Sequence, residues 1–192
     1  QKGHALSLDE IIFSKKNRID LPKNSFVITF DDGFENNYST AAPILHDLRI
    51  PATFYFSTDF VENQTLSWID EVEIMIQFTK KKFIINPISN KFENISTTIN
   101  KINFLKNLRK IEKKNNKLNV KNLTKNIKKF SLIDPNKYKN KVLDKKISWQ
   151  QIKELNNNDL FTIGGHSHEH LSLASLDFIN AKHQIEKSFK LF

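Results

Sequence analysis

The sequence predicts an α/β protein built on a parallel sheet. Three apolar runs rich in β-branched and aromatic residues, at residues 26–30, 52–57 and 160–165, are typical of buried strands. A helical pattern separates the first two runs, and the order strand–helix–strand over about 30 residues is that of a βαβ unit. Paired carboxylates follow the first run, and three histidines follow the third. The ends of the predicted strands therefore carry the polar groups of a candidate site.

The composition is that of a globular protein with one core. The chain has 192 residues, which is long enough for one sizeable core and short for two. It contains no cysteine, which excludes a disulfide framework and thiolate chemistry. No apolar run approaches the roughly 18 residues of a membrane span, and no signal peptide is visible, so a cytoplasmic and a cell-envelope location both stay open. Because the sequence starts at Gln1 and ends at Phe192 inside a helical pattern, we expect a piece of a longer chain.

The positive charge is concentrated in one internal segment. Residues 80–146 contain 20 Lys and Arg against 4 Asp and Glu, whereas the remainder contains 10 against 17. Two interpretations stay open for this segment. It could form a helical cap that binds an anionic partner, such as a charged glycan, a lipid-linked diphosphate sugar or a membrane surface. It could equally be a solvated helical face enriched in Lys by an AT-rich genome. The lack of a recognition motif argues against nucleic acid.

The helices are predicted from capping residues and apolar spacing. Residues 5–14 should form a short helix with Ser7 as its N-cap and Glu10 completing a capping box. A second helix is expected over residues 38–48, with Pro43 near its first turn. Further helical patterns occupy residues 68–78, 99–111, 119–130, 148–155 and 175–189. The pattern at 148–155 starts at Ser148 and is that of a capped helix, and Ser175 is the expected cap of the last.

Two polar clusters stand at the ends of predicted strands. Asp31 and Asp32 end the first strand, where an unpaired charge is costly unless it does chemistry or holds a metal. His166, His168 and His170 follow the third strand. An ordinary Asp-Gly turn and a surface histidine cluster are the alternatives. Because sites in parallel α/β proteins gather at the carboxyl ends of strands, the two clusters together favour a single site.

Imidazole and carboxylate groups suit a divalent, zinc-like ion. Two His and one Asp supply three ligands and leave a position for water, the arrangement of a catalytic zinc site. The ion lowers the pKa of its water, so that a nearby carboxylate can take the proton during attack on a carbonyl. Two adjacent aspartates can divide the roles of metal ligand and base. Zinc is the default ion, and Co²⁺ or Ni²⁺ could substitute.

The two clusters resemble the first motifs of a known enzyme family. Thr29-Phe30-Asp31-Asp32-Gly33 and His166-Ser167-His168-Glu169-His170 are similar to the patterns T-F-D-D-G and H-[S/T]-x-x-H of the polysaccharide deacetylases, the NodB-homology enzymes of carbohydrate esterase family 4. Residues 24–60 and 147–190 carry the resemblance. It implies the N-terminal part of a distorted, TIM-barrel-like (β/α) barrel. Residues 1–192 would then be one partial domain, with barrel parts at about 1–60 and 147–192 and a basic helical insertion at about 61–146.

The resemblance also implies a role for each site residue. Asp32, His166 and His170 are expected to bind the metal, most readily Zn²⁺, and Asp31 to act as the catalytic base. His168 falls on a variable position of the motif, so we expect it either behind the ligands or exposed to solvent.

The implied function is that of a metal-dependent hydrolase in carbohydrate metabolism. It would cleave the amide bond of N-acetyl groups on a polysaccharide or a lipid-linked, possibly anionic saccharide, with metal-bound water as nucleophile. The alternatives are a sugar deformylase, an O-acetyl esterase, or a non-catalytic carbohydrate-binding relative. The later motifs of the family supply an orienting arginine, an oxyanion loop and a histidine acid, and they find no match here, so this piece alone could be inactive. His183 lies in a predicted helix and is not expected to be that acid. The oligomeric state stays open.

Overall fold

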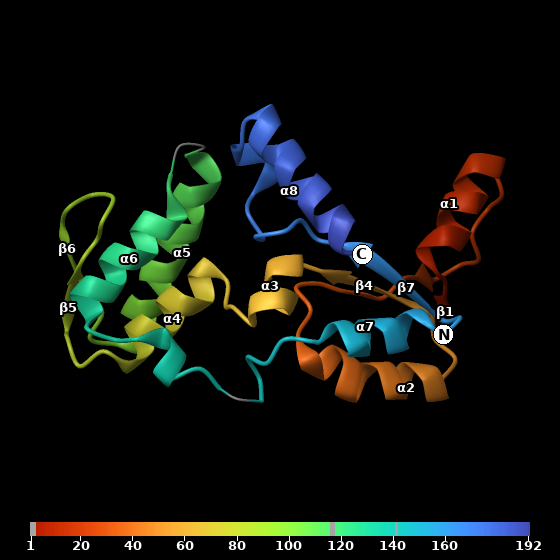
Figure 1. The fold of residues 1–192 in the computed structure, drawn as a ribbon, viewed down its shortest axis with the longest axis horizontal. Coiled ribbons are helices and arrows are strands. Elements are labelled where there is room, and N and C mark those ends of the chain that lie inside the picture. Colours follow the sequence, from red (N-terminus) through yellow and green to blue (C-terminus); the bar gives the residue numbers. More distant parts are fainter. Residues whose placement is uncertain (1–2, 116–117, 141) are drawn as a thin grey trace. The chain divides into compact units, whose positions relative to one another are not determined.

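A computed structural model describes residues 3–115, 118–140 and 142–192. The chain forms two compact units (Figure 1). The first comprises Gln1–Thr65, Lys141–His170 and Lys182–Phe192, and the second comprises Leu66–Asn140 and Leu171–Ala181. Among the described residues, no helix combines the length and the apolar character needed to cross a membrane.

The first unit is built on a parallel sheet, as the sequence predicts. Its strands are β3 (Thr29–Phe30), β4 (Ala52–Phe56) and β7 (Phe161–Gly165), in the order β3-β4-β7. Both pairings are parallel. In the described part of the chain these three strands form an open sheet and no closed barrel. The α/β class is therefore confirmed, and the expected barrel stays a prediction.

Aromatic side chains fill the core of the first unit. The ring of Phe54 stacks on Phe30, its cross-strand partner, at a centroid distance of 5.0 Å, and meets the edge of Phe161 at 5.3 Å. Helices α2 (Ala42–Asp47) and α7 (Trp149–Asn156) contribute further apolar side chains and lie along the same side of the sheet (Figure 1). Each large apolar side chain buried there stabilises the fold by about 1.5–3 kcal/mol.

Two helices of the first unit begin where their capping residues predict. Helix α1 spans Leu8–Asn17, and Ser7 and Glu10 form the expected capping box: Ser7 N–H donates to Glu10 Oε2 at 2.7 Å, and Glu10 N–H donates to Ser7 Oγ at 3.1 Å. Ser148 and Gln151 form the same box at the start of α7. Both starts depend on residues three positions apart, which explains why the sequence alone located them.

The first predicted strand is interrupted. Ser25–Phe26 forms β2 and pairs in parallel with β1 (His4–Ala5), whereas Thr29–Phe30 pairs with β4. Because the chain changes its pairing partner between these segments, it cannot form one continuous buried strand. The expected burial of Phe26 is wrong, since 41% of this residue is exposed. The other apolar residues of the run, Val27, Ile28 and Phe30, are half-buried.

Three further elements differ from the prediction. The helix expected over residues 38–48 begins with a π-helical turn, Asn37–Ala41, and Pro43, which has no N–H to donate, lies in the first turn of α2 that follows. Ser175 does not cap the last helix, because α8 spans Phe178–Leu191 and its first turn is capped by Asp177, whose Oδ1 accepts from Asn180 N–H at 2.8 Å. A short helix that the sequence did not predict, α3 (Thr58–Asn63), follows β4.

The second unit packs helices on a β-hairpin. Helices α4 (Trp68–Phe78), α5 (Thr98–Lys114) and α6 (Val120–Ser131) match the predicted helical patterns, followed by a 3₁₀ turn at Pro135–Lys137. The antiparallel hairpin of β5 (Phe83–Ile85) and β6 (Phe92–Asn94) was not predicted. The buried core of the second unit consists of Val72, Met75, Ile76, Ile84, Ile95, Phe104, Leu105, Leu108, Leu123 and Ile127. The expected division into barrel parts and an insertion at about residues 61–146 stays a prediction.

Gly164 is required because the ring of Tyr55 lies over it. A Cβ at Gly164 would stand 2.5 Å from Cε1 and 2.6 Å from Cδ1 of Tyr55, its cross-strand partner. We expect Gly164→Ala to lower the free energy of unfolding by about 1–3 kcal/mol in urea denaturation. The same substitution in a Tyr55→Ala background should cost much less, because the clashing ring is gone. Equal losses in the two backgrounds would contradict this explanation.

The carboxyl of Glu71 on α4 should make the second unit less stable as the pH rises. Burial raises the pKa of Glu71, Lys128 opposes this effect, and Asp134 and Asp70 add to it. Between the ordinary and the raised pKa the folded chain holds a proton that the unfolded chain has released, so stability falls as the pH rises through this window. Urea denaturation should therefore find Glu71→Gln stabilised relative to the wild type at neutral pH and not in acid.

The matched control is Glu73→Gln, which changes an exposed carboxylate on the same helix. It should show no such pH-dependent gain. A difference between Glu71→Gln and the wild type that is the same at acid and neutral pH would refute the prediction.

Candidate metal centre

The site forms where two outer strands of the sheet end. Asp31 and Asp32 follow β3, and His166 follows β7. Because both strands run parallel to β4, which lies between them, their carboxyl ends reach the same edge of the sheet. The His166 N–H continues the ladder by donating to the carbonyl of Phe56 at 2.9 Å. The structure thus brings together the two clusters that the sequence placed at strand ends.

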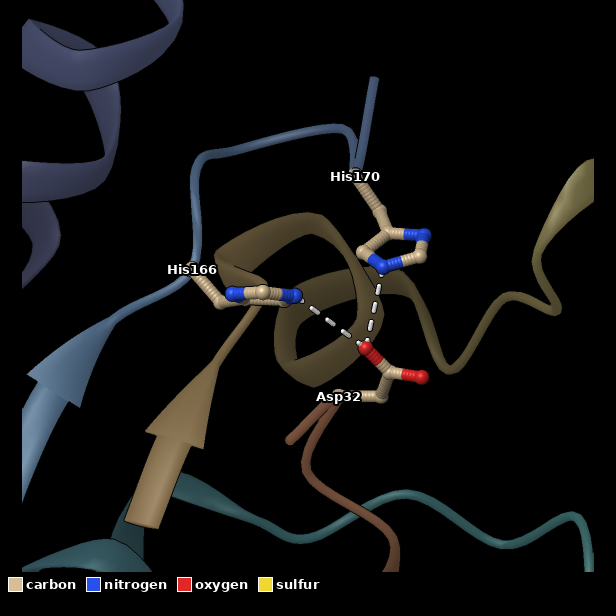
Figure 2. Close-up of side chains that lie close together, drawn as sticks. All are labelled: Asp32, His166 and His170. Atoms are coloured by element: carbon tan, nitrogen blue, oxygen red, sulfur yellow. Dashed lines mark ion pairs between the residues drawn. The ribbon is translucent and has the colours of Figure 1, made fainter. Parts of the chain in front are cut away.

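Asp32, His166 and His170 converge on one point (Figure 2). Oδ1 of Asp32 lies 3.0 Å from Nε2 of His170 and 3.5 Å from Nε2 of His166. One potential ligand atom from each residue lies within 4.8 Å of the others. The side chains are 28%, 37% and 33% exposed in the order Asp32, His166, His170, so solvent and a substrate can reach them.

A left-handed turn directs Asp32 toward the histidines. Asp32 has φ = 69° and Gly33 has φ = 73°. The Gly33 N–H donates to the carbonyl of Asp31 at 2.9 Å, and the Gly33 carbonyl accepts from Ile147 N–H at 2.9 Å. A Cβ at Gly33 would stand 2.9 Å from Cδ1 of Phe56. Glycine is therefore required at position 33 for two reasons: its φ is positive, and a Cβ would collide with the ring of Phe56.

The donor set fits a divalent, zinc-like ion. Within the described part of the chain, Oδ1 of Asp32 is buried and accepts no hydrogen bond of ordinary geometry. Such an oxygen is costly unless a cation or a donor compensates it. A tetrahedral zinc ion with bonds of about 2.0 Å holds its ligand atoms about 3.3 Å apart. The separations of 3.0 and 3.5 Å bracket this value.

The surroundings keep Asp32 in its anionic form. The His170 imidazole beside it lowers the pKa of the Asp32 carboxyl, against the opposite effect of burial, and the charges of His166 and Lys146 act in the same direction as His170. An ionised carboxylate is the form that ligates a metal. Asp32 is therefore in the required state at neutral pH.

Lys146 is a buried cation next to the cluster, and no pattern in the sequence selects it. Its side chain is almost fully buried, and Nζ lies 3.3 Å from the centroid of the Phe34 ring and 4.5 Å from that of Phe60. The Phe60 ring also contacts the His170 ring, at a centroid distance of 5.4 Å. Because Lys146 lies in a lysine-rich stretch, nothing in the sequence distinguishes it from its exposed neighbours.

His168 lies behind the cluster and not in solvent. It is only 4% exposed, and its Nδ1 lies 2.8 Å from Oγ1 of Thr58. Burial lowers the pKa of His168, Lys187 acts in the same direction, and Asp59 opposes it. Of the two positions expected for His168, the solvent-exposed one is wrong.

Asp31 and His183 stand apart from the three converging residues. Asp31 is exposed, and in the described residues its carboxylate makes no hydrogen bond or ion pair. His183 is exposed on α8. The role of Asp31 as a base stays a prediction.

Residues at the start of α3 hold the loop of residues 166–170 in place, and the sequence patterns did not indicate this role. Ser57 Oγ donates to the carbonyl of His166 at 2.8 Å, and Asp59 N–H donates to the carbonyl of His168 at 3.0 Å. These residues come directly after β4, so the same reasoning from strand ends would have pointed to them.

Comparisons with known proteins agree with the two motifs. A family model described as polysaccharide deacetylase matches residues 18–192. No curated protein matches the chain. Among solved structures, it is similar to the deacetylase domain of BpsB from Bordetella bronchiseptica, with 17% identity, 86% of this chain and 39% of that chain covered, and a TM-score of 0.41. It is also similar to a de-N-acetylase from Aggregatibacter actinomycetemcomitans, with 17% identity, 86% and 38% covered, and a TM-score of 0.36. The chain spans about two fifths of the length of these structures.

Removing the cluster should abolish metal binding. We expect Asp32→Ala, or His166→Ala with His170→Ala, to weaken Zn²⁺ binding by more than the roughly 10- to 100-fold that loss of a partner behind a ligand costs. Isothermal titration calorimetry with Zn²⁺ measures this directly. His183→Ala removes an exposed imidazole and should bind like the wild type. One tightly bound ion per chain after all three cluster residues are replaced would show that the site lies elsewhere.

Proposed function

Because the chain belongs to the polysaccharide deacetylase family, we propose that this protein is a metal-dependent hydrolase that removes N-acetyl groups from a polysaccharide or a lipid-linked sugar. The observation that carries the proposal is the convergence of Asp32, His166 and His170 from two strand ends, with a second carboxylate, Asp31, next in sequence. Three ligands with an exposed side suit catalysis better than a closed structural site does.

Asp32, His166 and His170 would hold the ion, with Zn²⁺ as the default and Co²⁺ or Ni²⁺ as substitutes. When bound, such an ion polarises a carbonyl oxygen and lowers the pKa of water at its open position. Side chains of the protein would carry out the proton transfer.

Asp31 would act as the general base. Asp32 faces the imidazoles with Oδ1, so Asp31 is the carboxylate left to take a proton. Its exposure gives it access to water and substrate. A carboxylate oxygen of Asp31 would accept the proton of the water that attacks the amide carbonyl. The C–N bond then breaks, the leaving sugar nitrogen takes the proton that Asp31 accepted, and acetate is released.

Contacts behind the ligands support this function by limiting their motion. The ring of His170 packs against Phe60, and the backbone carbonyl of His166 accepts from Ser57 Oγ. The buried His168 anchors the loop between them through Thr58. Because ligands held by such contacts lose little entropy on binding, they favour both metal affinity and a fixed geometry for attack.

The test separates the two aspartates. Asp31→Asn should bind Zn²⁺ as the wild type does and lose about 10²- to 10⁴-fold in the rate of acetate release from an N-acetylated oligosaccharide. Asp32→Ala should lose both binding and turnover. Equal effects of the two substitutions on metal binding would contradict the division of roles.

The same assay tests which acyl group the protein removes from the sugar. Formylated and O-acetylated sugars serve as parallel substrates, and faster turnover of either one would replace the N-deacetylase assignment with a deformylase or an esterase. Metal binding without turnover of any of them, in a protein that also carries the later motifs of the family, would favour a non-catalytic relative.

A further inference from the structure

The β5–β6 hairpin of the second unit exposes two phenylalanines on its outer face. Ile85 pairs with Phe92, and Phe83 pairs with Asn94, so both Phe side chains project from the same face. They are diagonal neighbours across the two strands, a spacing at which aromatic side chains come into contact range. Phe83 is 53% exposed and Phe92 is 75% exposed.

The opposite face of the hairpin packs against the core of the unit. Ile84, on that face, is 2% exposed and belongs to the apolar core. Glu93, its cross-strand partner, accepts a hydrogen bond from the side chain of Asn86, which is itself buried. The unit therefore does not need Phe83 and Phe92 for its own packing. Adjacent exposed aromatic side chains are typical of an interaction surface.

Exposed lysines lie next to both strands of the hairpin. Lys81 and Lys82 directly precede β5, Lys91 directly precedes β6, and all three are exposed. By strand alternation Lys81 shares the face of the two rings, whereas Lys82 and Lys91 alternate toward the opposite face. The one carboxylate of the hairpin, Glu93, lies on the inner face. The unit as a whole contains 17 Lys and Arg against 7 Asp and Glu. The partner of this surface should therefore be both anionic and able to take up apolar rings.

We propose that the outer face of the hairpin, formed by Lys81, Phe83 and Phe92 and flanked by Lys82 and Lys91, binds the surface of an anionic lipid bilayer. The phenyl rings would enter the boundary between headgroups and acyl chains, and the lysines would contact lipid phosphates. A soluble polyanion would engage the lysines and leave the rings in water. A second copy of the chain would oppose lysine to lysine.

Vesicle co-sedimentation tests the proposal. The wild-type chain should bind vesicles of phosphatidylcholine with phosphatidylglycerol, bind vesicles of phosphatidylcholine alone far less, and lose binding as the salt concentration rises. Phe83→Ser with Phe92→Ser should reduce the partition coefficient by about tenfold or more, because two apolar side chains no longer leave water. The rings are exposed, so circular dichroism and thermal unfolding should match the wild type.

The matched control is Leu48→Ser, which removes an apolar side chain that is 64% exposed at the end of α2 in the first unit. It should bind vesicles like the wild type. Insertion has its own readout: the fluorescence of Phe92→Trp should be quenched by brominated lipids, and that of Leu48→Trp should not.

Two results would overturn the proposal. The first is equal vesicle binding by the wild type and the double Phe variant, which would assign the interaction to the lysines alone. The second is binding to dextran sulfate or a single-stranded oligonucleotide with no binding to either vesicle, which would identify a soluble polyanion as the partner.

Discussion

The parallel register of β3, β4 and β7 is the constraint on which the candidate metal centre depends. Phe30 pairs with Phe54, and Phe56 pairs with Gly165, so the residues that follow β3 and β7 emerge at one edge of the sheet. A slip by one residue would move a strand by about 3.3 Å and reverse its side chains. The aromatic packing around Phe54 opposes such a slip, because it fits only one register. The core and the site are thus set by the same strand pairing.

Holding the Asp32 carboxylate at this site costs free energy, and the residues around it compensate for that cost. Asp32 adopts a positive φ and places a carboxylate oxygen where protein atoms in the described chain give it no ordinary hydrogen bond. Two imidazoles and the nearby charge of Lys146 keep it ionised. Lys146 in turn is enclosed by the faces of Phe34 and Phe60, where a cation is attracted to the ring quadrupole. An anion held without a full set of hydrogen bonds is suited to accept a metal ion.

The two units differ in their charge and in the candidate sites that they carry. The first contains 13 Lys and Arg against 14 Asp and Glu and carries the residues of the metal centre, whereas the second is strongly positive. The second unit is built from consecutive helices and a hairpin, an arrangement that leaves one hairpin face available for a partner. We therefore assign the proposed metal chemistry to the first unit and the proposed membrane contact to the second.

The sequence by itself determined the features that depend on neighbouring residues. It located the starts of α1 and α7, because each capping box joins residues three positions apart. It also predicted the parallel strands and the two polar clusters at their ends, because apolar runs and the residues that interrupt them can be read directly. The polysaccharide deacetylase family followed from those clusters and is confirmed.

Only the tertiary structure decided the features that depend on distant residues. The run 26–30 is split because its two ends pair with different strands. His168 is buried because Thr58, more than a hundred residues earlier, supplies its hydrogen-bond partner. Lys146 is distinguished from other lysines only by the rings of Phe34 and Phe60. In each case the environment comes from residues far away in the chain, and no local pattern encodes it.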